Sequence, residues 1–154
     1  MSTRLPKLDG GERPRNLAVQ LREAFTALND QVVPHLVEHG FADIRPAHGN
    51  VFQYLDDTGT TVSTLAERAQ MTKQAMAELV LRLEETGYVT RVPDPHDRRA
   101  KLVLPTDRGR EVFRVAQGLV PHVHSQVARL IGATRLEELR RDLELIRREF
   151  QAGP

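Results

Sequence analysis

Apolar residues in the first third of the chain recur three or four positions apart. They lie at Leu17, Leu21, Phe25, Leu28, Val32 and Leu36. This spacing puts them on one side of a helix, so it predicts a single long amphipathic helix. Pro34 falls inside the pattern and is expected to bend that helix. A second apolar run through Val51, Phe52 and Leu55 predicts a shorter helix before the turn sequence DDTGT.

The middle of the chain combines two short helical patterns with two strand patterns. Thr64 and Glu67 have the spacing of a capping box, which predicts the start of one helix. Thr72 can cap a second helix that ends near Gly87, and two short helices joined by a tight turn predict a helix-turn-helix. The segments YVTRVPD and AKLVLP flank PHDRR and carry the β-branched and aromatic residues of strands, which predicts an antiparallel hairpin, or wing.

The last third of the chain predicts two more helices. Thr106 can cap a long one, and Pro121 inside it is expected to cause a kink. After Gly132, Thr134 and Glu137 repeat the capping-box spacing. A seam with alternating steps of three and four then follows at Leu136, Leu139, Leu143, Ile146 and Phe150.

Together these elements predict a mainly α fold with a small antiparallel β wing. We expect a flexible N-terminal arm over residues 1–15, a winged helix-turn-helix lobe over residues 45–110, and a helical dimerisation lobe over residues 16–40 and 106–152, all within one compact domain. The apolar stripes on the N-terminal and C-terminal helices are larger than a single copy of the chain can easily cover, so they predict a homodimer. Packing of all the stripes within one chain is the alternative. The expected dimerisation residues are Leu17, Leu21, Leu28, Leu136, Leu139, Leu143, Ile146 and Phe150.

Composition narrows the class of protein. The formal net charge of +1 does not by itself indicate a partner, and the absence of cysteine excludes disulfides, thiolate metal sites and thiol-based redox sensing. No apolar run approaches the roughly 20 residues of a membrane span, and the start lacks a signal-peptide core, so we expect a cytoplasmic protein with no membrane contact. Nothing supplies a nucleophile with an adjacent base or a phosphate-binding loop, so we expect neither an enzyme nor a cofactor.

The second helix of the helix-turn-helix divides into two faces. Its expected inward residues are Ala75, Met76, Leu79, Val80 and Leu83. Its expected outward residues are Lys73, Gln74, Ala77, Glu78, Leu81 and Arg82. Side chains in the first turn of such a helix can read bases in the major groove of double-stranded DNA. The alternative is a face that is merely solvated.

The wing adds cations beside that face. Arg98 and Arg99 occupy the hairpin loop and are long enough to enter a minor groove, although they could instead pair with Asp94 and Asp97. Between residues 61 and 110 there are nine Lys/Arg and seven Asp/Glu, so the position of the cations matters more than their excess of two. The candidate DNA-binding residues are Thr72, Lys73, Gln74, Ala77, Glu78, Arg82, Asp97, Arg98 and Arg99.

The stretch DPHDRRAKLVLPTDRG resembles the wing signature of the MarR family of bacterial regulators. Asp97 and Arg99 match its Asp-x-Arg, and Thr106 and Gly109 match its Thr-x-x-Gly. The resemblance implies a homodimeric DNA-binding transcriptional regulator, usually a repressor, that leaves its operator when a small, often aromatic or phenolic, effector binds between the two lobes. It also implies that Arg99 contacts the minor groove and that Asp97 orients it.

The histidines are the remaining candidates. His35 and His39 lie four apart on the apolar face of the first helix, where they can be core or interface residues, line an effector pocket together with Phe52, or join His122 or His124 in a metal site. We favour the first interpretation and expect no metal site. The function predicted overall is a sequence-specific regulator on a palindromic operator, with a winged-helix protein interaction module as the alternative.

Overall fold

The computed structural model describes residues 16–151, so the arm predicted over residues 1–15 lies outside the described residues. In chain order the elements are α1 (Leu17–Asn29), α2 (Val32–Glu38), the 3-10 helix η1 (Pro46–His48), α3 (Gly49–Phe52), β1 (Thr60–Thr61), α4 (Val62–Arg68), α5 (Lys73–Glu85), β2 (Val89–Pro93), β3 (Lys101–Pro105), α6 (Asp107–Ile131) and α7 (Ala133–Gln151). The fold is mainly helical with one small antiparallel sheet, which confirms the predicted fold class.

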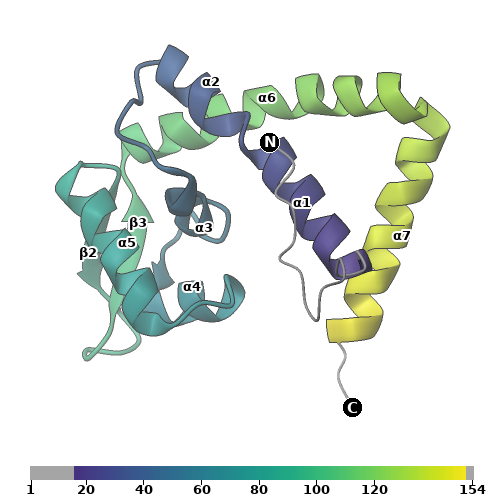
Figure 1. Ribbon diagram of the computed structural model, residues 1–154. Helices are drawn as coiled ribbons and strands as arrows, with labels where there is room; N and C mark the ends of the chain where they lie inside the picture. The colour runs from purple at the N-terminus through teal and green to yellow at the C-terminus, as the bar shows by residue number, and fades with distance from the viewer. Residues whose placement is uncertain (1–15, 152–154) are drawn as a thin grey trace, which may run out of the picture.

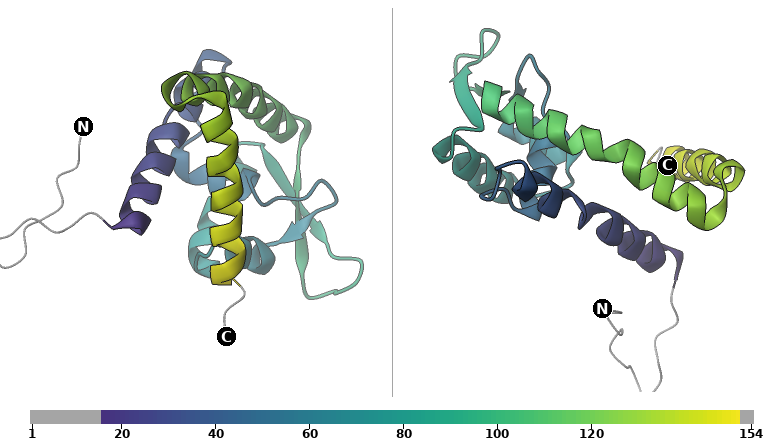
Figure 2. Two further views of the ribbon diagram at one scale, coloured as in Figure 1. Left: turned by 90° about the vertical axis from the view of Figure 1, so that its right-hand side faces the viewer. Right: turned by 90° about the horizontal axis from the view of Figure 1, so that it is seen from above.

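Two lobes are joined by α6 (Figure 1). The elements from η1 to β3 form the sheet lobe at one end of α6, and α7 folds back from the other end toward α1 to form the helical lobe (Figures 1 and 2). The first half of α6 belongs to the core of the sheet lobe, since Val112 and Val115 are buried there. No helix within residues 16–151 is long and apolar enough to cross a membrane.

The predicted hairpin is present, and the sheet has a third strand. β2 pairs antiparallel with β3 from Val89 opposite Pro105 to Pro93 opposite Lys101, so Pro105 is kept within the ladder. The sheet order is β1-β3-β2, and β1 contributes two residues, opposite Val103 and Leu102. Sequence patterns missed β1 because two residues are too few to show an alternation.

The N-terminal half is two helices, so the prediction of a single long helix was wrong. α1 ends at Asn29 and α2 begins at Val32. Pro34 explains the break, because a proline has no N–H to donate to the carbonyl four residues earlier and its ring clashes with that carbonyl. The residue four positions before Pro34 is Asp30, which lies in the turn.

Two of the predicted caps are confirmed and two were placed wrongly. The hydroxyl oxygens of Thr72 and Thr106 accept hydrogen bonds from the backbone N–H groups of Ala75 (3.2 Å) and Gly109 (3.2 Å). At α4 the cap is Thr61, one turn before the predicted Thr64, whose own N–H donates to the Thr61 hydroxyl at 3.1 Å. A capping side chain must stand just outside the helix, and Thr64 already lies inside it.

The start of α7 differs for a similar reason. Gly132 has a φ of 91° and separates α6 from α7, and its carbonyl already accepts from the N–H of Leu136 at 3.0 Å. Thr134 is therefore inside the first turn of α7, where it cannot act as the N-cap. α6 continues through Pro121 without interruption, although a break in the hydrogen-bond ladder is the usual cost of an internal proline.

Candidate nucleic-acid interface

The two faces of α5 are as predicted. Met76, Val80 and Leu83 are fully buried, and they anchor the helix in the core of the sheet lobe. The outward residues are all exposed: Thr72 at the cap, then Lys73, Gln74, Ala77, Glu78, Leu81 and Arg82. The guanidinium of Arg82 forms an ion pair with the carboxylate of Glu85 in the same helix, at 3.6 Å.

The wing loop joins β2 to β3 and is closed by backbone hydrogen bonds. The N–H of Asp94 donates to the carbonyl of Ala100, and the N–H of Ala100 donates to the carbonyl of Asp97, both at 3.0 Å. The Asp97 carboxylate accepts from the backbone N–H of Arg99 at 2.9 Å, and so it fixes the course of the loop. This leaves the Arg99 side chain exposed.

The guanidinium groups of Arg98 and Arg99 have no ion pair with any carboxylate in residues 16–151. The alternative that they pair with Asp94 and Asp97 is therefore wrong for this structure. Both aspartates instead accept backbone N–H groups within the loop, from His96 and Arg99. Both arginine side chains are exposed.

The helix and the wing share one edge of the molecule. Two views at right angles show the wing loop at the same lower edge as α4 and α5 (Figures 1 and 2). A flat or rod-shaped partner can therefore contact both elements at once. The structure brings all nine candidate DNA-binding residues onto these two elements or their caps.

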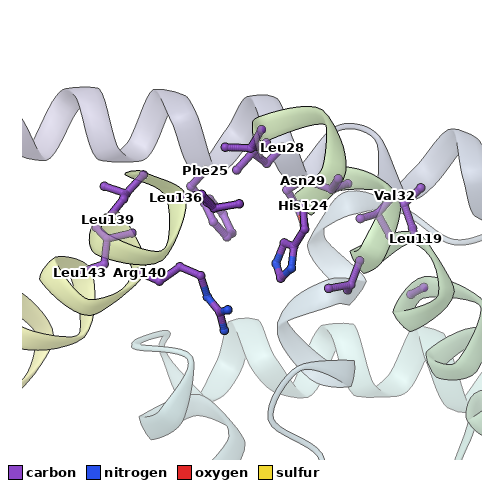
Figure 3. Close-up of a pocket in the computed structure, with 14 residues that line it drawn as sticks. Phe25, Leu28, Asn29, Val32, Leu119, His124, Leu136, Leu139, Arg140 and Leu143 are labelled. Carbon is purple, nitrogen blue, oxygen red and sulfur yellow. The ribbon is translucent and has the colours of Figure 1, made fainter. Parts of the chain in front are cut away.

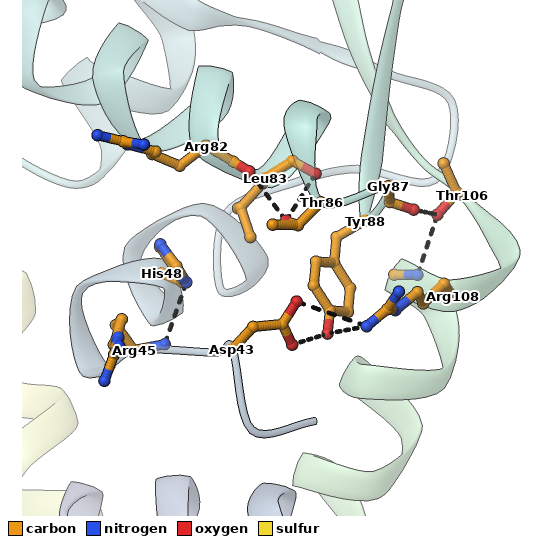
Figure 4. A network of polar contacts seen from close by, with 11 residues as sticks. Asp43, Arg45, His48, Arg82, Leu83, Thr86, Gly87, Tyr88, Thr106 and Arg108 are labelled. Carbon is orange, nitrogen blue, oxygen red and sulfur yellow. Dashed lines mark hydrogen bonds and ion pairs between the residues drawn. The ribbon is translucent and has the colours of Figure 1, made fainter. Parts of the chain in front are cut away.

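A buried tyrosine joins the base of the wing to α6 (Figure 4). Tyr88 is fully buried, its hydroxyl donates to the carboxylate of Asp43, and it accepts from Nη2 of Arg108 at 2.9 Å. The Arg108 guanidinium also lies 4.4 Å from the centre of the tyrosine ring. Burial, followed by the hydrogen bond to Asp43, raises the pKa of Tyr88, so the hydroxyl keeps its proton. Beside it, the Thr106 hydroxyl donates to the carbonyl of Gly87 at 2.6 Å.

Sequence reasoning missed this network, because its three members lie on separate segments. The Tyr88 and Asp43 positions are 45 residues apart, and Arg108 and Asp43 are 65 apart. The one local hint is the Gly87–Tyr88 step, where a helix-ending glycine precedes a large aromatic residue.

An interlobe cavity of about 650 Å³ lies between α1, α2, α3 and α6. Its apolar wall includes Phe25, Val32, Leu36, Phe52 and Ala116, and Arg45 and Asp30 are its charged lining residues. Phe52 thus lies where an effector residue was predicted. His35 and His39 do not line this cavity.

His35 of α2 and His39 at the C-cap of that helix lie elsewhere. His39 is exposed, and its Nδ1 is 2.7 Å from the carbonyl oxygen of His35, with the ring centres 4.5 Å apart. His48 is buried in η1, where its Nδ1 accepts from the N–H of Arg45 at 3.1 Å. Burial lowers the pKa of His48. Within residues 16–151, no three His, Cys, Asp or Glu side chains are grouped so that they could hold a metal ion.

The helical lobe contains an apolar cleft of about 350 Å³ (Figure 3). Helices α1, α2, α6 and α7 line it with Phe25, Leu28, Leu119, Leu136, Leu139 and Leu143 among others, and Asn29, His124 and Arg140 supply the few polar groups. Leu139 and Leu143 keep 41% and 37% of their surface exposed, and Leu17 and Phe150 keep 58% and 84%. Ile146 and Leu21 are half-buried, so one chain leaves most of the predicted dimerisation stripe uncovered.

Comparison with known proteins identifies similar regulators. Residues 42–100 match the family model described as MarR family. Transcriptional regulator HosA of Escherichia coli is 30% identical over 132 residues, which are 84% of this chain and 90% of HosA. Among solved structures, a MarR-family transcriptional regulator from Rhodococcus sp. RHA1 is 25% identical with a TM-score of 0.68, over 86% of this chain and 96% of that one. CouR from Rhodococcus jostii RHA1, bound to p-coumaroyl-CoA, is 26% identical with a TM-score of 0.67, over 85% and 91% of the two chains.

Proposed function

The chain belongs to the MarR family of DNA-binding transcriptional regulators, which are not enzymes, and from this premise we propose that it is a cytoplasmic repressor that binds a palindromic operator as a homodimer. A small aromatic or phenolic effector then lowers its affinity for the operator. The observation that carries the proposal is the shared edge of α5 and the wing, where Arg98 and Arg99 form no ion pair with a carboxylate of residues 16–151.

Each part of that edge has a separate task in the proposed complex. The first turn of α5, with Lys73 and Gln74, enters the major groove, and the small side chain of Ala77 permits close approach to the bases. Arg99 enters the adjacent minor groove, where the negative potential is strongest over narrow steps. Asp97 orients Arg99 through the loop backbone and leaves the guanidinium free for DNA.

The uncovered stripe of the helical lobe supports the homodimer. A second copy that covers Leu28, Leu139 and Leu143 would remove several large apolar side chains from water. Twofold symmetry would then present two copies of α5, which suit half-sites about one helical turn of DNA apart. His35 and His39 lie outside the interlobe cavity, so we place them in packing roles at the surface of α2.

The interlobe cavity supports effector binding. It is large enough for a ring-containing molecule, and it offers an apolar wall that includes Phe52 together with the cation of Arg45. CouR, a similar protein, binds p-coumaroyl-CoA, whose acyl group is a phenol. A ligand that fits here contacts both lobes, and so it can favour one arrangement of them over another.

A winged-helix module that binds only proteins is the alternative function. A gel-shift series with the DNA that flanks the gene for this protein, repeated at increasing salt, separates the two. Neutralised phosphates release counterions, so log affinity should fall steeply and linearly with log salt. Absence of binding at low salt, or binding that salt leaves unchanged, would exclude the DNA-binding proposal.

A further inference from the structure

One ion pair joins the recognition helix to the wing. Nε of Arg91 on β2 donates to Oε2 of Glu84 on α5 at 2.9 Å, and Nη2 of Arg91 donates to the same oxygen. Both side chains are about one-third exposed, at 33% and 32%. We call this contact the Glu84–Arg91 brace.

The brace differs from most ion pairs of residues 16–151 in what it connects. Seven of the others lie three or four residues apart within a single helix. The brace instead connects two elements, and these are the two that reach the DNA edge. The hydrogen bond from Arg91, helped by the charges of Arg91 and of Lys101 on β3, lowers the pKa of the Glu84 carboxyl, so Glu84 stays charged.

Its position follows from the strand register and from the helix repeat. Arg91 stands opposite the buried Val103 in the β2–β3 ladder, so its side chain is on the sheet face that packs against α5. Glu84 follows Lys73 by eleven residues, about three full turns, so both lie on the same side of α5. The brace therefore lies at the C-terminal end of α5, on the side of the helix that carries Lys73 in its first turn.

A carboxylate in that place needs an explanation. It lies about 16 Å along α5 from Lys73, where its charge acts only weakly on the phosphates, so a direct effect on DNA does not explain it. Paired with Arg91, it holds β2 at a fixed distance from the helix. Since the wing loop continues directly from β2, this distance also sets where the loop cations stand relative to α5.

We propose that Glu84 and Arg91 are positioning residues, which set the wing against α5 so that Arg99 and Gln74 reach adjacent grooves of one site. This inference rests on the proposed function, because it assigns to the brace the geometry of DNA binding. It requires no contact between either residue and DNA.

The variant Glu84→Gln tests the proposal, because charge and position predict different results. If only charge mattered, removal of this negative group, which lies about 16 Å along α5 from Lys73, would leave binding unchanged or slightly tighter. A lost brace should instead weaken operator binding about two- to fivefold, as expected for a partly exposed ion pair. Unchanged or tighter binding by Glu84→Gln would overturn the proposal.

A double-mutant cycle with Arg99→Ala asks whether the brace acts through the wing. If it does, Glu84→Gln should no longer weaken binding once Arg99 is absent, since its effect depends on that side chain. An equal loss in both backgrounds would overturn the proposal. The exchanged pair Glu84→Arg with Arg91→Glu keeps the net charge and should recover most of the lost affinity.

Glu111→Gln is the matched control. Glu111 pairs with Arg114 within α6, so this variant removes the same charge from an Arg–Glu pair that joins no two elements and lies away from the DNA edge. We expect its operator affinity to equal that of the unaltered protein. A loss equal to that of Glu84→Gln would contradict a specific role for the brace.

Amide hydrogen exchange without DNA separates this inference from the proposed function. If the unaltered protein binds no DNA, the proposed function fails. The exchange result alone then decides whether the Glu84–Arg91 brace attaches β2 to α5. Glu84→Gln should accelerate exchange in the β2–β3 ladder relative to Glu111→Gln, because β2 has lost its attachment to α5. Equal exchange in the two variants would overturn the inference.

Discussion

Arg99 shows that the backbone and the side chain of one residue can have separate partners. Its N–H is bound by Asp97 within the loop, and its guanidinium extends from the exposed surface of the wing. The loop conformation therefore does not depend on the charge of Arg99. A substitution there should remove the contact with DNA and leave the wing folded.

This separation gives the first prediction. Arg99→Ala should weaken binding to most DNA sequences and reduce the slope of log affinity against log salt by about one unit, because one phosphate-region cation is lost.

Gln74→Ala should instead change which bases are preferred, by about 1–3 kcal/mol for each bidentate contact. Affinities of both variants for a randomised operator library measure the difference. An unchanged preference profile would exclude Gln74 from base recognition.

His48 gives a prediction for pH. Its folded pKa is lowered by burial, so as the pH falls below about 6.5 the unfolded chain takes up a proton before the folded chain does. The stability that the neutral imidazole contributes is therefore present above that pH and is lost as the pH falls toward the folded pKa. Melting temperatures at pH 7.5 and 5.5 should differ less in His48→Asn, which keeps an acceptor for the Arg45 N–H. An equal difference in both proteins would count against this role of His48.

At the scale of elements, the close packing of the first turn of α6 against Tyr88, just before β2, depends on Gly109. A Cβ built there would lie 2.1 Å from the carbonyl oxygen of Tyr88, a backbone atom that cannot move freely. Gly109→Ala should therefore destabilise the protein by about 1–3 kcal/mol, despite the higher helix propensity of alanine.

Gly118, on the same helix, is the matched comparison. Apart from its two chain neighbours and the nearby backbone of its own helix, no atom of residues 16–151 lies within 4 Å of a Cβ built at Gly118. Gly118→Ala should raise the unfolding free energy by about 0.5–1 kcal/mol, since helix propensity alone acts there. Denaturant unfolding of both variants at one protein concentration measures the two effects. Stabilisation by Gly109→Ala would contradict the close approach.

The same elements show what sequence could and could not predict. The caps at Thr72 and Thr106, the inward face of α5 and the hairpin depend on neighbours within a few residues, and patterns found all of them. The brace, the Tyr88 network and the burial of His48 join or enclose distant segments, so no local pattern contains them. The division between α1 and α2 lies between these cases, because Pro34 indicated a disturbance but not that the helix would end before it.

At the scale of the whole molecule, the uncovered stripe on α7 leads to a prediction about assembly. Leu143→Asp puts a charge on the apolar cleft, so it should produce monomers that no longer hold the operator, because a buried unpaired charge is costly. Leu145 is exposed at 58% and does not line the cleft, so Leu145→Asp should remain dimeric. Sedimentation of both variants measures their mass. A dimer that survives Leu143→Asp would indicate a different interface.

The uninterrupted course of α6 has a mechanical consequence. Its 25 residues span about 37 Å, from the tyrosine network at one end to α7 at the other. If α6 moves as one body, a tilt of about 5° at its first turn shifts its last turn by about 3 Å, because of its length alone. In a twofold dimer each sheet lobe is attached to the helical lobe through its own copy of α6. A ligand bound near the first turn of α6 can therefore change the distance between the two copies of α5 by several ångströms.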